Sequence, residues 1–322
     1  MPADQLTEIA ILYYIDGLTQ EELSKRFGIS RAKVGRLLKR AQEEGIVEIR
    51  VSHHPKFNTE LEEELVRRFN IDRAIVSIDH RDPDRQRTML ASLVASHLDQ
   101  TLNDGMIVAV GMGRNISAVS DQLIPSSSRR NCTFVCAIGG SCRGGEIMNP
   151  DHICRRLATR FGGESETLYA PALVGDPGIR EALINNDTVK QTLSKASRAD
   201  VALVGIGDMA EDSNMVRMGW FSPQEISEAK LSGTVGDIMG YDFIDIHGNL
   251  AVTKMQGRVV GLRMQDLRRI PNVIAIASEN TKSTAILGAL RTGAINTLAT
   301  TATNVINVLN LDDVTKPHAR NG

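Results

Sequence analysis

The chain has 322 residues and a formal net charge of −2 at pH 7; 42% of its residues are apolar and 24% are charged. These values are typical of a folded protein with room for two domains. They exclude a polycationic nucleic-acid binder, and no apolar run approaches the roughly 18 residues that a membrane span needs. Because the N-terminus has neither a basic start nor an apolar signal core, we expect a cytoplasmic protein that has no membrane partner.

The most informative stretch, residues 19–40, predicts two helices joined by a tight turn. Thr19 and Glu22 have the spacing of a capping box, which starts the first of these helices. Gly28 can adopt the positive φ that ends this helix and turns the chain. Ser30 is then placed to cap the second helix. The pattern indicates a helix-turn-helix.

The second of these helices has an apolar face and a basic face. The apolar residues recur at helical spacing and form the core face: Val34, Leu37, Leu38 and Ala41. The outward face carries five basic residues: Arg31, Lys33, Arg36, Lys39 and Arg40. Residues 25–40 contain seven Lys or Arg and no Asp or Glu. Since a solvated surface helix usually mixes the two signs, this face predicts a recognition helix for the groove of double-stranded operator DNA.

We assign the DNA contacts by position along the motif. Residues at the start of the recognition helix are expected nearest the base edges: Ser30, Arg31, Lys33 and Val34. Residues that we expect at phosphates follow along the chain: Arg36, Lys39 and Arg40. Thr19 and Gln20 are expected where the preceding helix meets the DNA backbone. The alternative is a helix-turn-helix whose basic face contacts only water.

Residues 1–55 contain eight basic and eight acidic residues, so positive charge is segregated there and not in excess. One short helix offers few phosphate contacts, and a dimer doubles them on a two-fold symmetric site, so we expect a homo-oligomer. The alternating run Ile46–Val51 predicts a wing strand, which makes residues 1–55 a winged helix-turn-helix domain. A second capping box, at Thr59 and Glu62, predicts a linker helix in residues 56–70.

Residues 71–315 alternate between short apolar strands and amphipathic helices. The predicted strands are Arg73–Ile78, Met106–Val110, Thr133–Ile138, Thr167–Tyr169, Val201–Gly205, Phe243–Ile246, Val273–Ala277 and a short one near Thr297. The predicted helices are Arg85–Leu102, Asn115–Leu123, His152–Phe161, Asp187–Ser197, Ser283–Arg291 and Thr303–Leu309, besides Leu6–Ile15 at the N-terminus. This alternation is typical of an α/β domain with a doubly wound, mostly parallel sheet covered on both faces.

Glycine-rich segments follow three predicted strands, where an open α/β sheet binds its ligands. They are residues 111–115, 139–141 and 205–208. The first lets the backbone approach an anion at a helix N-terminus, although it lacks the full dinucleotide fingerprint. The candidate ligand-binding residues of these segments are Gly111, Gly113, Arg114, Asn115, Gly139, Gly140 and Ser141. A simple turn is the alternative for each segment.

Two charged residues complete the candidate site. Asp237 lies between Gly236 and Gly240, where a carboxylate can accept hydrogen bonds from sugar hydroxyls; an Asx turn is the alternative. Lys282 opens a helix soon after the strand Val273–Ala277. Its ammonium and the helix N-terminus predict an anion receptor, and an ordinary surface lysine is the alternative.

The four cysteines give no sign of a metal site. Cys132, Cys136, Cys142 and Cys154 form no Cys-x-x-Cys pair, and His152 is the only histidine near them. A cluster of this kind is more typical of reduced core thiols than of zinc ligands. We therefore expect neither a metal nor another cofactor.

Four motifs, in this order, resemble the SorC family of sugar-responsive bacterial transcriptional regulators: Tyr14–Gln20, Val204–Gly207, Gly236–Tyr241 and Glu279–Lys282. The resemblance covers nearly the whole chain. It implies a winged helix-turn-helix joined to an effector domain similar to phosphosugar isomerases, assembled as a homodimer or homotetramer. It also implies that a phosphorylated sugar or a related metabolite relieves repression or, in some members, activates.

The family's effector contacts carry over onto Asp237 and Lys282, and its strand-end loops onto residues 111–115 and 139–141. Two departures concern the ligand. Arg114-Asn115 stands where relatives often have a small hydroxyl residue, and Ser141-Cys142 leaves no lysine that could form an imine with an aldehyde.

The predicted function is a DNA-binding regulator of a carbohydrate or polyol operon, whose operator binding is controlled by a phosphorylated sugar or a related metabolite. One alternative has the same mechanism with an unphosphorylated sugar or polyol as effector. Another is an active sugar-phosphate isomerase or deaminase, which needs a base and an acid across the site. Asp237 alone does not supply them, and His80 and His247 are isolated in the sequence.

Overall fold

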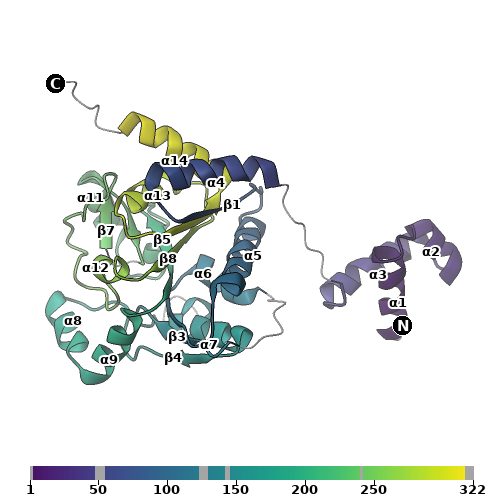
Figure 1. Cartoon of the computed structure of the whole chain (residues 1–322), viewed down its shortest axis with the longest axis horizontal. Helices are drawn as coiled ribbons and strands as arrows, with labels where there is room; N and C mark the ends of the chain where they lie inside the picture. Colours follow the sequence, from purple (N-terminus) through teal and green to yellow (C-terminus); the bar gives the residue numbers. More distant parts are fainter. Residues whose placement is uncertain (1–2, 48–54, 123–129, 142–145, 240–241, 316–322) are drawn as a thin grey trace. The chain divides into compact units, whose positions relative to one another are not determined.

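Three helices make up the N-terminal part of the computed structural model: α1 (Ala3–Tyr14), α2 (Gln20–Phe27) and α3 (Arg31–Glu43) (Figure 1). The structure describes residues 3–47, 55–122, 130–141, 146–239 and 242–315. The chain divides into two compact units, residues 1–53 and 54–322. No helix of the described residues is both long and apolar enough to cross a membrane.

The predicted start and turn signals of the helix-turn-helix are confirmed. The hydroxyl of Thr19 accepts from the backbone N–H of Glu22, whose carboxylate accepts from the backbone N–H of Thr19 at 2.8 Å. Gly28 has a φ of 63°, and the hydroxyl of Ser30 caps α3. The predicted wing strand, Ile46–Val51, falls mainly on residues outside the described ones.

Helix α4 (Pro55–Phe69) belongs to the second unit, and it starts earlier than the sequence suggested. The predicted capping box at Thr59 and Glu62 is wrong because proline suits the first turn of a helix, and the helix begins at Pro55. Glu62 instead accepts from the backbone N–H of Val76 at 2.8 Å. Asn58 donates to the carbonyl oxygen of the same residue at 2.7 Å. These bonds fasten α4 to strand β1.

A parallel sheet forms the centre of the second unit. Its strand order is β1-β9-β8-β5-β2-β3-β4, and all the pairs along this path are parallel. The strands are β1 (Arg73–Ser77), β2 (Ile107–Val110), β3 (Thr133–Cys136), β4 (Glu164–Glu166), β5 (Val201–Asp208), β8 (Asn272–Ala277) and β9 (Thr297–Thr301). The chain runs from β2 outward through β3 to β4, then returns to β5 and runs the other way. The sheet therefore has its topological switch point between β2 and β5.

Apolar side chains alternate between the two faces of this sheet. In β8, Val273, Ala275 and Ala277 join one core, whereas Ile274 and Ile276 join the other. The first core is closed by α4, α13 (Ser283–Arg291) and α14 (Ala302–Thr315). The second is closed by α5 (Pro83–Thr101), α6 (Arg114–Asp121) and α7 (Pro150–Phe161). Helices thus cover both faces, as predicted, and Figure 1 shows α4 beside α14.

Two strands of the second unit differ from the sequence prediction. The edge strand β4 lies at Glu164–Glu166 and not at the predicted Thr167–Tyr169, because an edge strand needs few apolar residues. Strand β6 (Thr234–Ile238) was not predicted; it pairs antiparallel with the end of β5 and with β7 (Asp242–Asp245). The helices that escaped prediction are α8 (Pro177–Ile184), α10 (Asn214–Arg217), α11 (Pro223–Leu231) and α12 (Met264–Leu267); α9 (Asp187–Ala196) was predicted.

Gly163, between α7 and β4, lies close to the backbone of Cys132. Substitution of this glycine therefore tests how tightly the two segments are packed. A Cβ added there would lie 2.0 Å from the carbonyl oxygen of Cys132, whereas one added at Gly175 meets nothing within 4 Å. We expect Gly163→Ala to cost about 1–3 kcal/mol or more and Gly175→Ala to be nearly neutral. Urea unfolding followed by the fluorescence of the single tryptophan, Trp220, measures both. Equal stabilities of the two variants would contradict this packing.

Candidate functional site

The DNA-contact residues predicted for α3 and its cap lie on the surface, with the exception of Val34. All five basic residues are exposed, as is the capping residue Ser30. Val34 has no exposed surface and packs in the core of the N-terminal unit beside Leu23 and Leu38. Its predicted contact with base edges is therefore wrong, because the apolar period that places Val34 on the helix also turns it inward.

The free positive charge is concentrated in the first half of α3. Lys39 pairs with Glu43 at 3.5 Å, and Arg40 pairs with Glu44 at 2.5 Å, both within the helix. Arg31, Lys33 and Arg36 take part in none of the ion pairs formed among the described residues. The unneutralised face therefore coincides with the end of the helix where base contacts were predicted.

The start of α2 lies close to α3. A Cβ added at Gly35 would lie 3.6 Å from the amide oxygen of Gln20, an ordinary van der Waals distance, so Gln20 and Gly35 are neighbours. The hydroxyl of Thr19 is already used by the cap. Gln20 and the backbone at Thr19 thus lie next to the basic helix, as expected for residues that meet the DNA backbone.

The second unit contains a cavity of about 290 Å³ at the ends of β2 and β5, which is the switch point of the sheet. Five residues predicted as effector contacts line it together: Gly113, Arg114, Asn115, Asp237 and Lys282. They come from the start of α6, from β6 and from the start of α13. The topology therefore brings the separate sequence signals to one place.

A carboxylate that the sequence analysis missed joins the charged groups of the cavity. Glu279 lies 3.1 Å from the ammonium of Lys282 and 3.6 Å from the guanidinium of Arg114. It also accepts a hydrogen bond from Asn115 at 3.1 Å. Lys282 also donates a hydrogen bond to the carbonyl oxygen of Ile206 at 2.7 Å. Two cations thus converge on one half-buried anion.

The groups around Glu279 change the pKa of its carboxyl. Burial alone would raise the pKa of this carboxyl, but the charge of Lys282 and the hydrogen bonds from Asn115 and Lys282 outweigh it and lower the pKa to about 2. Asn115 is itself held by the hydroxyl of Ser278, which donates to its side-chain oxygen at 2.6 Å. The hints in the sequence were the position of Glu279 two residues after β8 and its place in the Glu279–Lys282 motif.

Asp237 lies in strand β6 and not in the glycine loop that was predicted. Its side chain is 3% exposed and faces Gly207 in β5, the residue paired with it in the sheet. A Cβ at Gly207 would lie 2.0 Å from the Oδ1 atom of Asp237. Glycine in the Val204–Gly207 motif is therefore needed to leave room for this carboxylate beside the cavity.

Four predicted contacts do not line the cavity: Gly111, Gly139, Gly140 and Ser141. Gly111 is packed against the backbone of β5, and Gly139 against the backbone of Ala170, where a Cβ would meet an oxygen at 2.5 Å. Ser141 accepts a hydrogen bond at 3.2 Å from the indole of Trp220, which does line the cavity. Ser141 therefore supports the wall through Trp220, and Gly139 serves close backbone packing and not ligand approach.

Part of the cavity wall is apolar and rich in methionine. It includes Met112, Met215, Met218, Trp220 and Met239, which lie beside polar lining residues such as Asp208, Asp212 and Arg217. The apolar residues come from several loops and from α10, so no periodic pattern marked them in the sequence. Methionine side chains are adaptable and suit a ligand whose carbon skeleton must be covered without fixed geometry.

The cysteines lie in the core. Cys132, Cys136 and Cys154 are buried, and the Sγ atoms of the last two are 3.7 Å apart. Burial raises the pKa of the Cys154 thiol well above its ordinary value. Among the described residues, no group of His, Cys, Asp or Glu is arranged to hold a metal ion.

Fold and site together define a chain with a small helix-turn-helix unit and a separate α/β unit that contains a small polar cavity. Residues 53–310 match the family model “Putative sugar-binding domain”, and residues 8–51 match a helix-turn-helix domain model. The chain therefore belongs to the SorC family of sugar-binding bacterial transcriptional regulators, and it is a sugar-responsive operon regulator.

Three relatives illustrate the similarity. The sorbitol operon regulator of Klebsiella pneumoniae is 31% identical over 299 residues, which are 92% of this chain and 94% of that protein. The crystal structure of full-length SorC from K. pneumoniae gives a TM-score of 0.77 at 30% identity, over 96% of this chain and 99% of that one. The sugar-binding domain of a transcriptional repressor from Vibrio fischeri gives a TM-score of 0.74 at 52% identity, over 79% and 99% of the two chains.

The lowered pKa of Glu279 leads to a test of the charge cluster. Its stabilising effect is present above the ordinary pKa of 4.5 and is lost as the pH falls through about 2. At about 1.4 kcal/mol per pKa unit, it is on the order of 3 kcal/mol. We expect Glu279→Gln to lower the free energy of unfolding at pH 7, and the difference from the parent to shrink below pH 4.5. Urea titrations over a pH series measure this, and the exposed Glu211→Gln serves as control. A difference that does not change with pH would contradict the pairing.

Proposed function

We propose that this regulator binds its operator as a homodimer or homotetramer through α3 of each copy, and that a phosphorylated sugar or polyol in the cavity controls the binding. The observation that carries the proposal is the convergence of Arg114 and Lys282 on one carboxylate inside a cavity at the switch point. A site with two cations directed at one point suits an anionic group of the ligand. The cytoplasm is where such a protein meets both DNA and metabolites.

The cavity suits a small, polar ligand with a carbon chain. At about 290 Å³ it is at the lower end of the range for ligand pockets. Arg114 and Lys282 can bind a phosphate, and the carboxylate of Asp237 can accept from hydroxyl groups. The methionine and tryptophan wall covers the C–H groups between them. A ligand phosphate competes with Glu279 for the same two cations, so binding rearranges the charge cluster.

The effector could also be an unphosphorylated sugar or polyol. The observation that favours this alternative is that Glu279 already neutralises Arg114 and Lys282, so a neutral ligand meets no unpaired charge there. Hydroxyl groups would then bind Asp237 and Glu279. The enzymatic alternative has weaker support, because the relatives are named as regulators and the residues that line the cavity include no histidine.

Control of operator binding requires that the ligand prefer one state of the protein. A preference of about 100-fold corresponds to roughly 2.7 kcal/mol, which is enough to release an oligomer from a moderately tight site. The direction of the response, release or recruitment, depends on which state binds DNA better. The geometry of the site is compatible with both.

The first test concerns α3. We expect Arg31→Ala and Lys33→Ala each to weaken operator binding by about 1–3 kcal/mol, because each removes a contact of the exposed, unneutralised end of the helix. Fluorescence anisotropy with a duplex from the region upstream of the gene measures this. Arg155→Ala, which removes an exposed charge from α7, serves as control. If both α3 variants bind like the parent, α3 is not the recognition helix.

The second test separates the two effector classes with sorbitol and sorbitol 6-phosphate as probes, chosen after the named operon of the Klebsiella relative. We expect the phosphate to change operator affinity at a lower concentration than the free polyol. Lys282→Met should raise the half-maximal concentration of the phosphate by about 10- to 100-fold, the effect of one lost charged hydrogen bond. Operator binding without effector should remain.

The control is Lys254→Met, at an exposed lysine that pairs with Glu228. If sorbitol acts as well as its phosphate and Lys282→Met changes neither response, the anion site is misassigned and the unphosphorylated effector takes its place.

A further inference from the structure

The first turn of α14 is bonded to the segment that carries the charged residues of the cavity. Asn304 has no exposed surface, and its amide nitrogen donates to the carbonyl oxygen of Glu279 at 3.0 Å. Its side-chain oxygen accepts from the hydroxyl of Ser283 at 3.0 Å. One buried amide therefore holds both ends of the segment 279–283, which contains Glu279 and Lys282. A shift of this segment must act on the start of α14.

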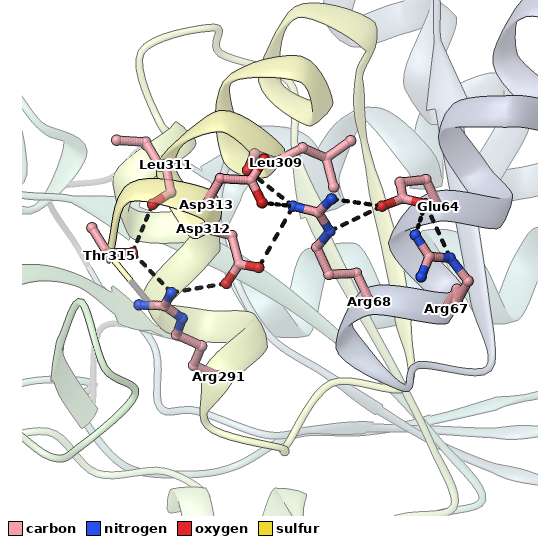
Figure 2. Close-up of polar contacts among 9 residues, drawn as sticks. All are labelled: Glu64, Arg67, Arg68, Arg291, Leu309, Leu311, Asp312, Asp313 and Thr315. Carbon is pink, nitrogen blue, oxygen red and sulfur yellow. Dashed lines mark hydrogen bonds and ion pairs between the residues drawn. The ribbon is translucent and has the colours of Figure 1, made fainter. Parts of the chain in front are cut away.

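The other end of α14 is bonded to helix α4 by a buried charge cluster (Figure 2). Asp312, whose side chain is 3% exposed, lies 2.8 Å from the guanidinium of Arg291 and 3.8 Å from that of Arg68. Arg68, in the last turn of α4, also donates to the carbonyl oxygen of Leu309 at 3.2 Å and pairs with Asp313. The cluster thus joins α4, α13 and α14 at one point.

Helices α13 and α14 therefore begin at the cavity segment and end at this cluster. Helix α13 follows Lys282 directly, and its last residue is Arg291. Both helices are packed on the same core and behave as stiff bodies over these lengths. A buried carboxylate between two arginines is costly to separate, so the three helices move together at this end.

Helix α4 is the first element of the second unit after the DNA-binding unit in the chain. We propose that α13 and α14 carry the state of the cavity to α4 through the buried Asp312, and that Arg68 is the positioning residue that receives it. The proposal rests on the proposed function for the identity of the effector. The coupling itself can be tested without any effector.

The neighbouring residue offers a matched control. Arg67 and Arg68 are adjacent, carry the same charge and both bond to Glu64, but only Arg68 reaches α14. In the full-length protein we expect Arg68→Gln to reduce by 10-fold or more the change in operator affinity that saturating sorbitol 6-phosphate produces. Operator affinity without effector and binding of the phosphate, measured by calorimetry, should each stay within about 3-fold of the parent. Arg67→Gln should behave like the parent in all three measurements.

A purely structural role of Arg68 predicts a lower melting temperature with an unchanged effector response, and that result would overturn the proposal. An equal loss of response in Arg67→Gln would overturn it as well. If Arg68→Gln does not fold, as judged by circular dichroism, Arg68→Lys keeps the charge but loses the forked contacts. We then expect a partial loss of the response.

A second experiment needs no effector and uses the Glu279→Gln substitution to perturb the cavity. Hydrogen exchange of the α4 amides, residues 58–69, is measured in the parent, in each single variant and in the double variant with Arg68→Gln. We expect Glu279→Gln to change exchange in α4 in the parent background by several-fold and to have no effect when Arg68 is replaced. An equal effect in both backgrounds would refute the coupling.

This second experiment also separates the two proposals. If neither probe alters operator binding by the parent, the effector class under the proposed function is wrong. The exchange experiment still decides whether Asp312 and Arg68 connect the cavity to α4.

Discussion

The interaction between Glu279 and its two cations is the constraint on which the effector unit depends. Arg114 comes from the turn after β2, and Lys282 comes from the segment after β8. Without an anion between them, the two segments would bring like charges together inside a protein wall. The carboxylate therefore keeps the ends of distant strands at one point, and it also holds the place that the anionic group of a ligand can take. The same ion pairs therefore stabilise the fold and keep the two cations of the site in position.

Much of this architecture could be predicted from local signals. The capping bonds of Thr19 and Ser30 need only neighbours in the sequence, and the apolar period of α3 needs only one face to be buried. The central strands of the parallel sheet are covered on both sides, so they appeared as apolar runs. The strand-end rule then placed Gly113, Arg114, Asn115 and Lys282 at one cavity, and the flanking glycines pointed to Asp237.

The rest depended on neighbours that are remote in sequence. Strands β4 and β6 were misplaced or missed because their residues are held by pairing with another strand and not by an apolar pattern. Gly139 looked like part of a ligand loop, although it serves close packing against the backbone of Ala170 and Pro171. Val34 shows the reverse error: its place near the start of α3 suggested a base contact, and its period decided its burial. In each case the residues that surround a side chain or glycine in the structure show whether it packs inside the protein or faces a ligand.

The two free edges of the sheet are each protected from further strand pairing. At the β1 edge, the side chains of Asn58 and Glu62 occupy the carbonyl oxygen and the N–H of Val76, groups that a foreign strand would need. At the β4 edge, Glu164 places a negative charge where another strand would approach, and Glu166 forms an ion pair with Lys195 at 2.8 Å. This arrangement disfavours edge-to-edge pairing between copies of the protein. The sheet can carry a ligand site at its centre without becoming a template for aggregation at its margins.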